Sequence, residues 1–327
     1  MARRWSGTAG TLVGLVVGAA FLLVAFRGTP FAAVAAVLSA GDWLGPGLTV
    51  LAGTVAFVAA KTLRWRVLLG PGRALPARAL AAPVLAGLAL NALIPHSGEF
   101  LRAASLQRRT GRSPASVLSS IVAERLFDVL GILLLGAVAL GFVHASPALM
   151  TAFRLLGLIA LVLAGGVLAV LLLPNACRRL AALLVRPLPQ AVRGWLLGHV
   201  DEGIAGLEPV RSPATALTVC GWTLLQWLAV AVCVHGSAGV AGVVVSIPAT
   251  LLVVAGIVLA FLVPNAPAYL GAVQLAFAMT LVPLGVAEER ALAASVVYQL
   301  LMIVPTILAG LALVRYTLAR EGRLSAP

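Results

Sequence analysis

Long apolar runs follow one another along the chain, separated by short polar segments. They cover about residues 10–26, 44–63, 79–95, 114–143, 155–173, 213–235, 248–263, 268–284 and 290–314. A transmembrane helix needs about 20 mainly apolar residues, within a range of roughly 17–25. Most of these runs are therefore predicted to be membrane helices. The stretch 31–40 is too short to cross and is predicted to form an elbow at the membrane surface.

The composition agrees with a chain that lies mostly in lipid. Of its 327 residues, 61% are hydrophobic and 10% are charged, and the mean hydropathy is +1.09. Soluble domains carry about 25% charged residues. The sequence therefore predicts an all-α polytopic membrane protein that forms one domain over residues 1–327. The run 10–26 follows Arg3 and Arg4 like a signal sequence, but its length and the later runs favour an uncleaved first membrane helix.

The basic residues indicate topology and lipid contacts. The formal net charge is +13, yet no predicted soluble domain could present a basic face to nucleic acid. Basic residues lie between the apolar runs, where they orient membrane helices and attract anionic lipids. They predict cytoplasmic N- and C-termini, and the basic loop 174–212 is predicted to lie along the membrane surface. The three cysteines, Cys177, Cys220 and Cys233, lack paired metal-ligand spacing, so no metal or cofactor is predicted.

Two of the apolar stretches are broken. If segment 79–112 enters the membrane and returns to the same side, most of the 23 basic residues face the cytoplasm. Pro95 and Gly98 supply the break, because Pro removes a donor and Gly relaxes the backbone. The run 248–284 is interrupted at 263–271, and basic residues do not distinguish a re-entrant pair from two crossings there. Arm length and symmetry favour a re-entrant pair.

The order of segments suggests an internal symmetry. Each half contains a span, a span, a broken pair and a span, and the halves start on opposite sides of the membrane. The sequence thus predicts about six full transmembrane helices and two broken pairs, arranged as inverted repeats over 1–145 and 146–327. In secondary transporters, paired discontinuous helices of this kind mark the substrate site.

Five ionisable residues interrupt the apolar pattern near the first broken pair. They are Glu99, Arg102, Glu124, Arg125 and Asp128. Glu124 and Asp128 share a helix face, and Arg125 lies beside both. Charge inside a bilayer persists mainly where it pairs or faces a wet cavity. Two interpretations follow: ion pairs that only hold helices together, or the wall of a polar cavity that admits a lipid headgroup.

Neighbouring polar residues can extend this site. Asn91, His96 and Ser97 are expected to add hydrogen bonds at the break. The sequence contains no H-E-x-x-H, C-x-x-C or Ser/His/Asp arrangement that would indicate catalysis. An enzyme is therefore not predicted.

The same stretch resembles a known family. The pattern N-x-x-I-P-x-x-G-E-x-x-R from Asn91, then G-R-S at 111–113 and E-R-x-x-D from Glu124, is similar to flippase-like membrane proteins, the transmembrane region of lysylphosphatidylglycerol synthases. The stretch KTLRWRVLL at 61–69, and Pro264–Gln274 followed by Gly285 and Tyr298, are similar to other parts of that family. The resemblance covers essentially the whole chain. It assigns the five ionisable residues to the core of the site.

The resemblance implies translocation of a polar-headed lipid between leaflets of the cytoplasmic membrane. In the second broken helix it draws attention to Pro264, Asn265, Pro267, Tyr269, Gly271 and Gln274. Gln274 is neutral where the family often has an acid, which argues against proton coupling or charge recognition by that half. Lysyl transfer is not expected, because the soluble aminoacyl-transfer domain is missing before Pro327. The alternative is a scaffold for a lipid or cell-envelope enzyme, and either protein can have such a partner or form a homo-oligomer.

Overall fold

The computed structural model describes residues 23, 31–70, 75–94, 97–143, 147–261 and 267–324, and within these ranges it is helical without strands. The predicted all-α class is therefore correct, and the first run, 10–26, lies outside these ranges apart from Leu23. The helices are α2 (Phe31–Ser39), α3 (Gly45–Leu68), α4 (Ala77–Leu93), α5 (Ser97–Thr110), α6 (Pro114–Leu140), α7 (Pro147–Leu172), α8 (Pro174–Leu184), α9 (Gln190–Gly206), α10 (Pro213–Val240), α11 (Ile247–Phe261), α12 (Ala272–Leu281), α13 (Glu288–Tyr298) and α14 (Val304–Leu324).

Several helices are suited to crossing a membrane. Five helical stretches of the described ranges are long and apolar enough: Gly45–Leu68, Arg154–Leu172, Pro213–Val240, Pro267–Leu284 and Glu288–Arg315. Helix α6 has 27 residues and is also long enough, although three charged residues interrupt its apolar pattern. The fold is therefore that of a multi-pass membrane protein.

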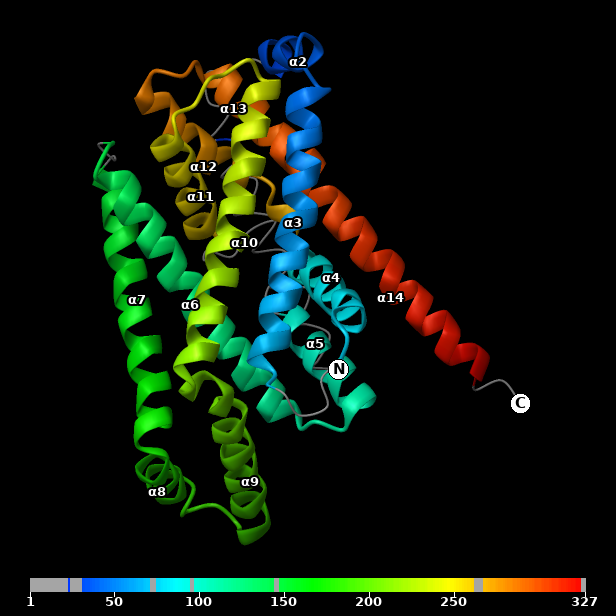
Figure 1. Ribbon diagram of the computed structural model, residues 1–327, viewed down its shortest axis with the longest axis vertical. Helices are drawn as coiled ribbons and strands as arrows, with labels where there is room; N and C mark the ends of the chain where they lie inside the picture. Colours follow the sequence, from blue (N-terminus) through cyan, green and yellow to red (C-terminus); the bar gives the residue numbers. More distant parts are fainter. Residues whose placement is uncertain are drawn as a thin grey trace.

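Helices α3 and α10 run side by side through the centre (Figure 1). Glycine permits their close approach, because a Cβ on Gly53 would lie 2.7 Å from Cys233 Sγ and one on Gly236 would lie 2.8 Å from Pro46 O. Small residues of this kind let the backbones of membrane helices pack closely. The α3–α10 pair forms the centre of the bundle. The first broken pair packs against α3 and the second packs against α10.

The first broken pair, α4 and α5, enters and leaves at one end of the bundle. Arg112 Nη1 donates to Leu69 O at 2.6 Å, which places the end of α5 beside the end of α3. At the tip, the backbone N–H of Gly98 donates to Asn91 Oδ1 at 2.7 Å. These contacts agree with the re-entrant prediction for 79–112.

The second broken pair, α11 and α12, opens at the opposite end (Figure 1). Arg290 Nη1 donates to Gly242 O at 2.8 Å, so the start of α13 lies beside the end of α10. The chain thus leaves this pair where it entered, which favours the re-entrant alternative. The two pairs approach each other from opposite ends, as an inverted arrangement requires, while the division at residue 145 stays a prediction.

The last helical stretch contains a wider turn between α13 and α14. Residues Gln299–Ile303 form a π turn just before Pro305. Because proline has no N–H, Leu301 O loses its helical donor. The hydroxyl of Thr54 on α3 lies 3.3 Å from this carbonyl and supplies a substitute. A broken backbone inside a membrane protein is tolerated where neighbouring helices satisfy it in this way.

The basic loop 174–212 is mostly helical. Helices α8 and α9 extend from the lower end of the bundle (Figure 1). Helix α9 packs closely on the start of α6, where a Cβ on Gly206 would lie 2.5 Å from Ser116 O. Helix α8 contains no buried residue. Its predicted position along the membrane surface stays a prediction.

Candidate functional site

The site is built around one face of α6. Ser113 caps this helix by accepting from Ser116 N at 3.2 Å, and Pro114 follows at the first helical position, as expected for a helix start. One turn apart on the helix, Glu124 and Asp128 are 1% and 8% exposed. A buried carboxylate needs charged or hydrogen-bonding partners, and α3, α5 and α10 supply them.

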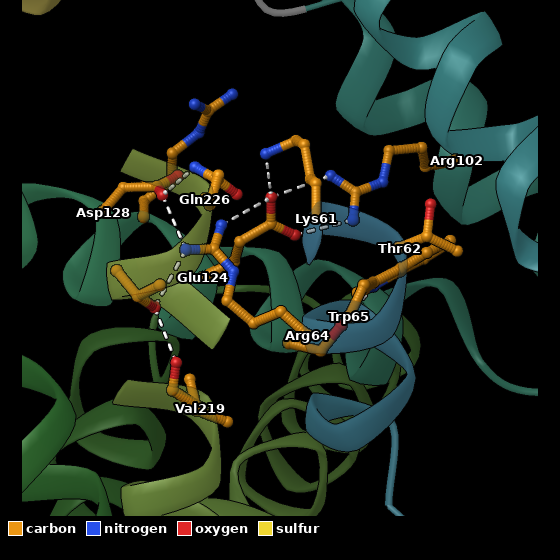
Figure 2. Close-up of polar contacts among 12 residues, drawn as sticks. Lys61, Thr62, Arg64, Trp65, Arg102, Glu124, Asp128, Val219 and Gln226 are labelled. Atoms are coloured by element: carbon orange, nitrogen blue, oxygen red, sulfur yellow. Dashed lines mark hydrogen bonds and ion pairs between the residues drawn. The ribbon is translucent and has the colours of Figure 1, made fainter. Parts of the chain in front are cut away.

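Glu124 is shared by three cations (Figure 2). Arg102 Nη2 on α5 donates to Glu124 Oε2 at 2.7 Å. From α3, Lys61 Nζ donates to Glu124 Oε1, and Arg64 Nη2 lies 3.3 Å from the same oxygen. A single carboxylate therefore connects the first broken pair to the central α3–α10 pair.

Asp128 extends the network to α10. It accepts from Arg64 Nη1 at 2.7 Å and from Gln226 Nε2 at 3.0 Å, both at Oδ1. Arg64 Nη1 also donates to Thr223 Oγ1 at 3.1 Å. The network thus joins α3, α6 and α10 within the described part of the bundle, and Figure 2 shows how these side chains converge.

An aromatic ring fixes the arginine of the broken pair. The Arg102 guanidinium carbon lies 4.1 Å from the centre of the Trp65 ring. Trp65 is itself held because its Nε1 donates to Ser120 Oγ at 3.2 Å. A guanidinium over an indole face is attracted by the ring quadrupole. Arg102 is therefore held by a cation–π contact as well as by Glu124.

A second ion pair lies closer to the tip of the broken pair. Arg125 Nη2 donates to Glu99 Oε1, and Asn91 Nδ2 donates to the same oxygen at 3.2 Å. The Arg125 side chain is 45% exposed, unlike the buried cations around Glu124. Ser97 Oγ donates to Ile94 O at 2.6 Å and so closes the turn. Arg125 is thus a cation that a ligand can reach.

The structure brings together most of the residues singled out in the first half. His96 lies outside the described ranges. The ion-pair partners of Glu124 and Asp128 lie on α3 and α5, while Arg125 pairs with Glu99. Two of these partners, Lys61 and Arg64, were not among the predicted site residues, and they are 6% and 0% exposed.

The sequence does contain a signal that Lys61 and Arg64 belong to the site. They lie three positions apart near the end of an apolar run, where i and i+3 share a helix face. The stretch also contains three carboxylates, Glu99, Glu124 and Asp128, but only two predicted arginine partners, so charge balance in an apolar surrounding calls for a further cation. Gln226 and Thr223 carry no comparable signal, since single polar residues on a long apolar helix are common.

In the second half, glutamines hold an unusual turn. Gly271 has a φ of 83°, and Ala268 and Tyr269 have φ values of 59° and 60°. The N–H of Gly271 donates to Gln274 Oε1 at 2.8 Å, and Gln274 Nε2 donates to Gln299 Oε1 at 2.6 Å. Non-glycine residues at positive φ cost free energy and need support from their surroundings. Pro264 and Asn265 lie outside the described residues.

Gln299 completes this support and gives a test. Its Nε2 donates to Ala268 O at 2.7 Å. Gln299→Leu leaves this carbonyl and Gln274 Nε2 without these partners, so we expect a loss of about 1–3 kcal/mol in the free energy of unfolding. Thermal unfolding of the detergent-solubilised protein measures it. Gln190→Leu, at an exposed position on α9, serves as the control, and equal melting temperatures for both variants would contradict the prediction.

A cavity of about 160 Å³ lies between the tips of the two broken pairs. Its polar lining residues include Lys61, Asn91, Arg102, Arg125, Asp128, Gln226, Tyr269 and Tyr298. Tyr269 stacks on Phe261 with ring centres 4.0 Å apart, and both line the cavity from the second pair. Apolar side chains from α4, α11 and α14 complete the wall. The first half of the chain therefore contributes the charged side chains of the cavity wall, and the second half contributes its tyrosines and Phe261.

Some polar atoms of this wall have no protein partner. Arg102 Nε, Gln226 Oε1 and Trp227 Nε1 are buried and unpaired, and all three residues line the cavity. Buried polar groups without a partner are rare in folded proteins because they cost free energy. Among the described residues, no three His, Cys, Asp or Glu side chains gather as metal ligands.

The fold and the cavity define a multi-pass helical membrane protein with charged residues around an internal site. The family model described as the lysylphosphatidylglycerol synthase TM region matches residues 11–310. The chain therefore belongs to this family, as its motifs predicted. No curated protein and no solved structure matches the chain.

Proposed function

We propose that the protein moves a polar-headed lipid, a phospholipid or glycolipid, between the leaflets of the cytoplasmic membrane. The observation that carries the proposal is the charged cavity between two broken helix pairs that enter from opposite ends. Such an arrangement allows the site to face one leaflet or the other as the halves move. We further propose that both termini lie in the cytoplasm and that the lipid leaves chemically unchanged.

The cavity chemistry supports a phosphate-containing or hydroxyl-rich headgroup. Arg125 is the exposed cation, and arginine binds phosphate through charge-assisted hydrogen bonds. Asn91, Gln226 and Tyr269 also line the cavity and carry groups that can hydrogen-bond to headgroup oxygens or hydroxyls. The acyl chains stay in lipid. Family membership gives independent support for lipid handling.

Reconstitution into liposomes that contain a headgroup-labelled phosphatidylglycerol tests the proposal. We expect leaflet exchange above that of empty liposomes, and a decrease of about 10–100-fold in Arg125→Ala, as loss of a charged hydrogen bond predicts. Arg178→Ala is the matched control, because Arg178 is 47% exposed and paired with Asp201 but lies on α8. Arg125→Lys should retain part of the exchange.

Two results would overturn transport. One is exchange by the wild type equal to that of empty liposomes, and the other is equal exchange by the Arg125→Ala and Arg178→Ala proteins. In the first case a scaffold role is tested by co-purification with lipid or envelope enzymes. A scaffold needs the fold but does not need the reachable Arg125.

A further inference from the structure

A second hollow lies outside the cavity, between α3, α4 and α14. Its volume is about 490 Å³, and Val55, Ala59, Ala81 and Ala309 are among its lining residues. One wall is rigid, because α14 crosses α4 closely and a Cβ on Gly310 would lie 2.3 Å from Leu85 O. We call this hollow the α3–α4–α14 groove. Its walls are set by helix backbones.

The polar residues of the groove present apolar surface. Thr62 Oγ1 donates to Val58 O at 2.7 Å and Thr306 Oγ1 donates to Met302 O at 2.7 Å. Thr54 Oγ1 lies 2.9 Å from Val50 O and 3.3 Å from Leu301 O, so its single proton is shared by two backbone carbonyls. Each hydroxyl is thus turned to a backbone carbonyl and satisfied there. The groove therefore suits a hydrocarbon and offers little to a polar ligand.

Two features distinguish the groove from ordinary lipid-facing surface. Arg78, an exposed residue at the start of α4, lies among its lining residues, so a cation adjoins the apolar surface. Thr306 lines both the groove and the charged cavity, so this residue of α14 separates the two hollows. The groove therefore lies next to the proposed headgroup site.

We propose that the α3–α4–α14 groove binds an acyl chain of an anionic phospholipid whose phosphate contacts Arg78. The apolar walls match the chain, and the guanidinium matches the phosphate. If the protein transports lipid, this groove is the lateral path from the bilayer to the cavity, and that part rests on the proposed function. Binding in the groove does not depend on transport.

Photo-crosslinking in liposomes tests the groove. The probe is phosphatidylglycerol with a photoactivatable diazirine in one acyl chain, and labelled peptides are mapped by mass spectrometry. We expect labelling concentrated at 77–85 and 305–309. It should fall severalfold in Ala309→Trp, which fills the groove, and in Arg78→Ala. The same diazirine chain on zwitterionic phosphatidylcholine should label these segments less.

Matched variants decide between outcomes. Leu161→Trp places the same ring on the exposed face of α7 and should leave labelling unchanged. If Ala309→Trp fails to fold, Val55→Trp at the exposed lip replaces it. Even labelling of α7 and α14, or labelling insensitive to the groove variants, indicates ordinary surrounding lipid and overturns the proposal. Crosslinks between two copies of the chain at these segments overturn it in favour of a dimer contact.

Leaflet exchange measured on the same preparations separates the two proposals. Groove labelling without exchange supports the groove and overturns transport. Exchange that persists in Ala309→Trp while labelling is lost supports a binding groove but overturns its role as the entry path. Exchange and labelling that fall together support both.

Discussion

Replacement of Glu124 by alanine is expected to lower the free energy of unfolding by about 3–5 kcal/mol, the usual cost of removing one partner from a buried ion pair. The reason is that Glu124 is the common partner of three buried cations, Lys61, Arg64 and Arg102. Without it, Lys61 and Arg102 lose the carboxylate with which they form their ion pairs. Arg102 also loses its link between α5 and α6.

The melting temperature in detergent, followed by circular dichroism, measures this effect. Glu208→Ala, at an exposed position after α9, is the control and should change little. Glu124→Asp should be intermediate, because it keeps the charge but shortens the reach. A Glu124→Ala protein as stable as the control would show that the network contributes no net stability.

The second large effect is expected from Gly98→Ala. An added Cβ would lie 2.0 Å from Gly87 O and 2.8 Å from Asn91 Cγ, and neither the carbonyl nor the turn can move freely. Helices α4 and α5 must then separate, which pulls Arg102, one turn further along α5, away from Glu124. Overpacking of this kind costs about 1–3 kcal/mol and occasionally more. We expect loss of stability together with loss of leaflet exchange.

Gly157→Ala is the matched control for this substitution. Gly157 lies within α7, and a Cβ there meets nothing within 4 Å. Alanine in a helix interior is favoured over glycine by roughly 0.5–1 kcal/mol, so this variant should be as stable as the wild type or slightly more. If both variants melt at the same temperature, the crossing at Gly98 is not a close contact in the folded protein.

The membrane fold and the first broken pair could be predicted because their signals are local. Apolar runs of spanning length give helices, and the break at Gly98 together with the basic residues after it gives a pair that returns. Glu99, Glu124 and Asp128 were identified as site residues because charge is rare in lipid and needs a reason. The length of the apolar runs and the cost of charge in lipid thus indicated segments that line the candidate site.

The partners of these residues could not be derived in the same way. Lys61 and Glu124 are 63 positions apart, and Gln226 and Asp128 are 98 positions apart. Such pairings depend on how α3 and α10 are rotated, which hydrophobicity does not specify for helices with apolar residues on all sides. Gln299 was missed for the same reason, since its role depends on a carbonyl at Ala268, 31 positions away.

The π turn Gln299–Ile303 has a consequence for how α14 is aligned. A π turn holds one residue more than an α turn, and each residue rotates an α-helix by about 100°. With this extra residue, Met302 and Ile307 line the charged cavity while Pro305 and Ala309 line the groove. Removing one residue would restore a continuous α-helix but would turn these two faces away from their hollows. In the segment Gln299–Ile303, substitutions should therefore be tolerated better than the insertion or deletion of a residue.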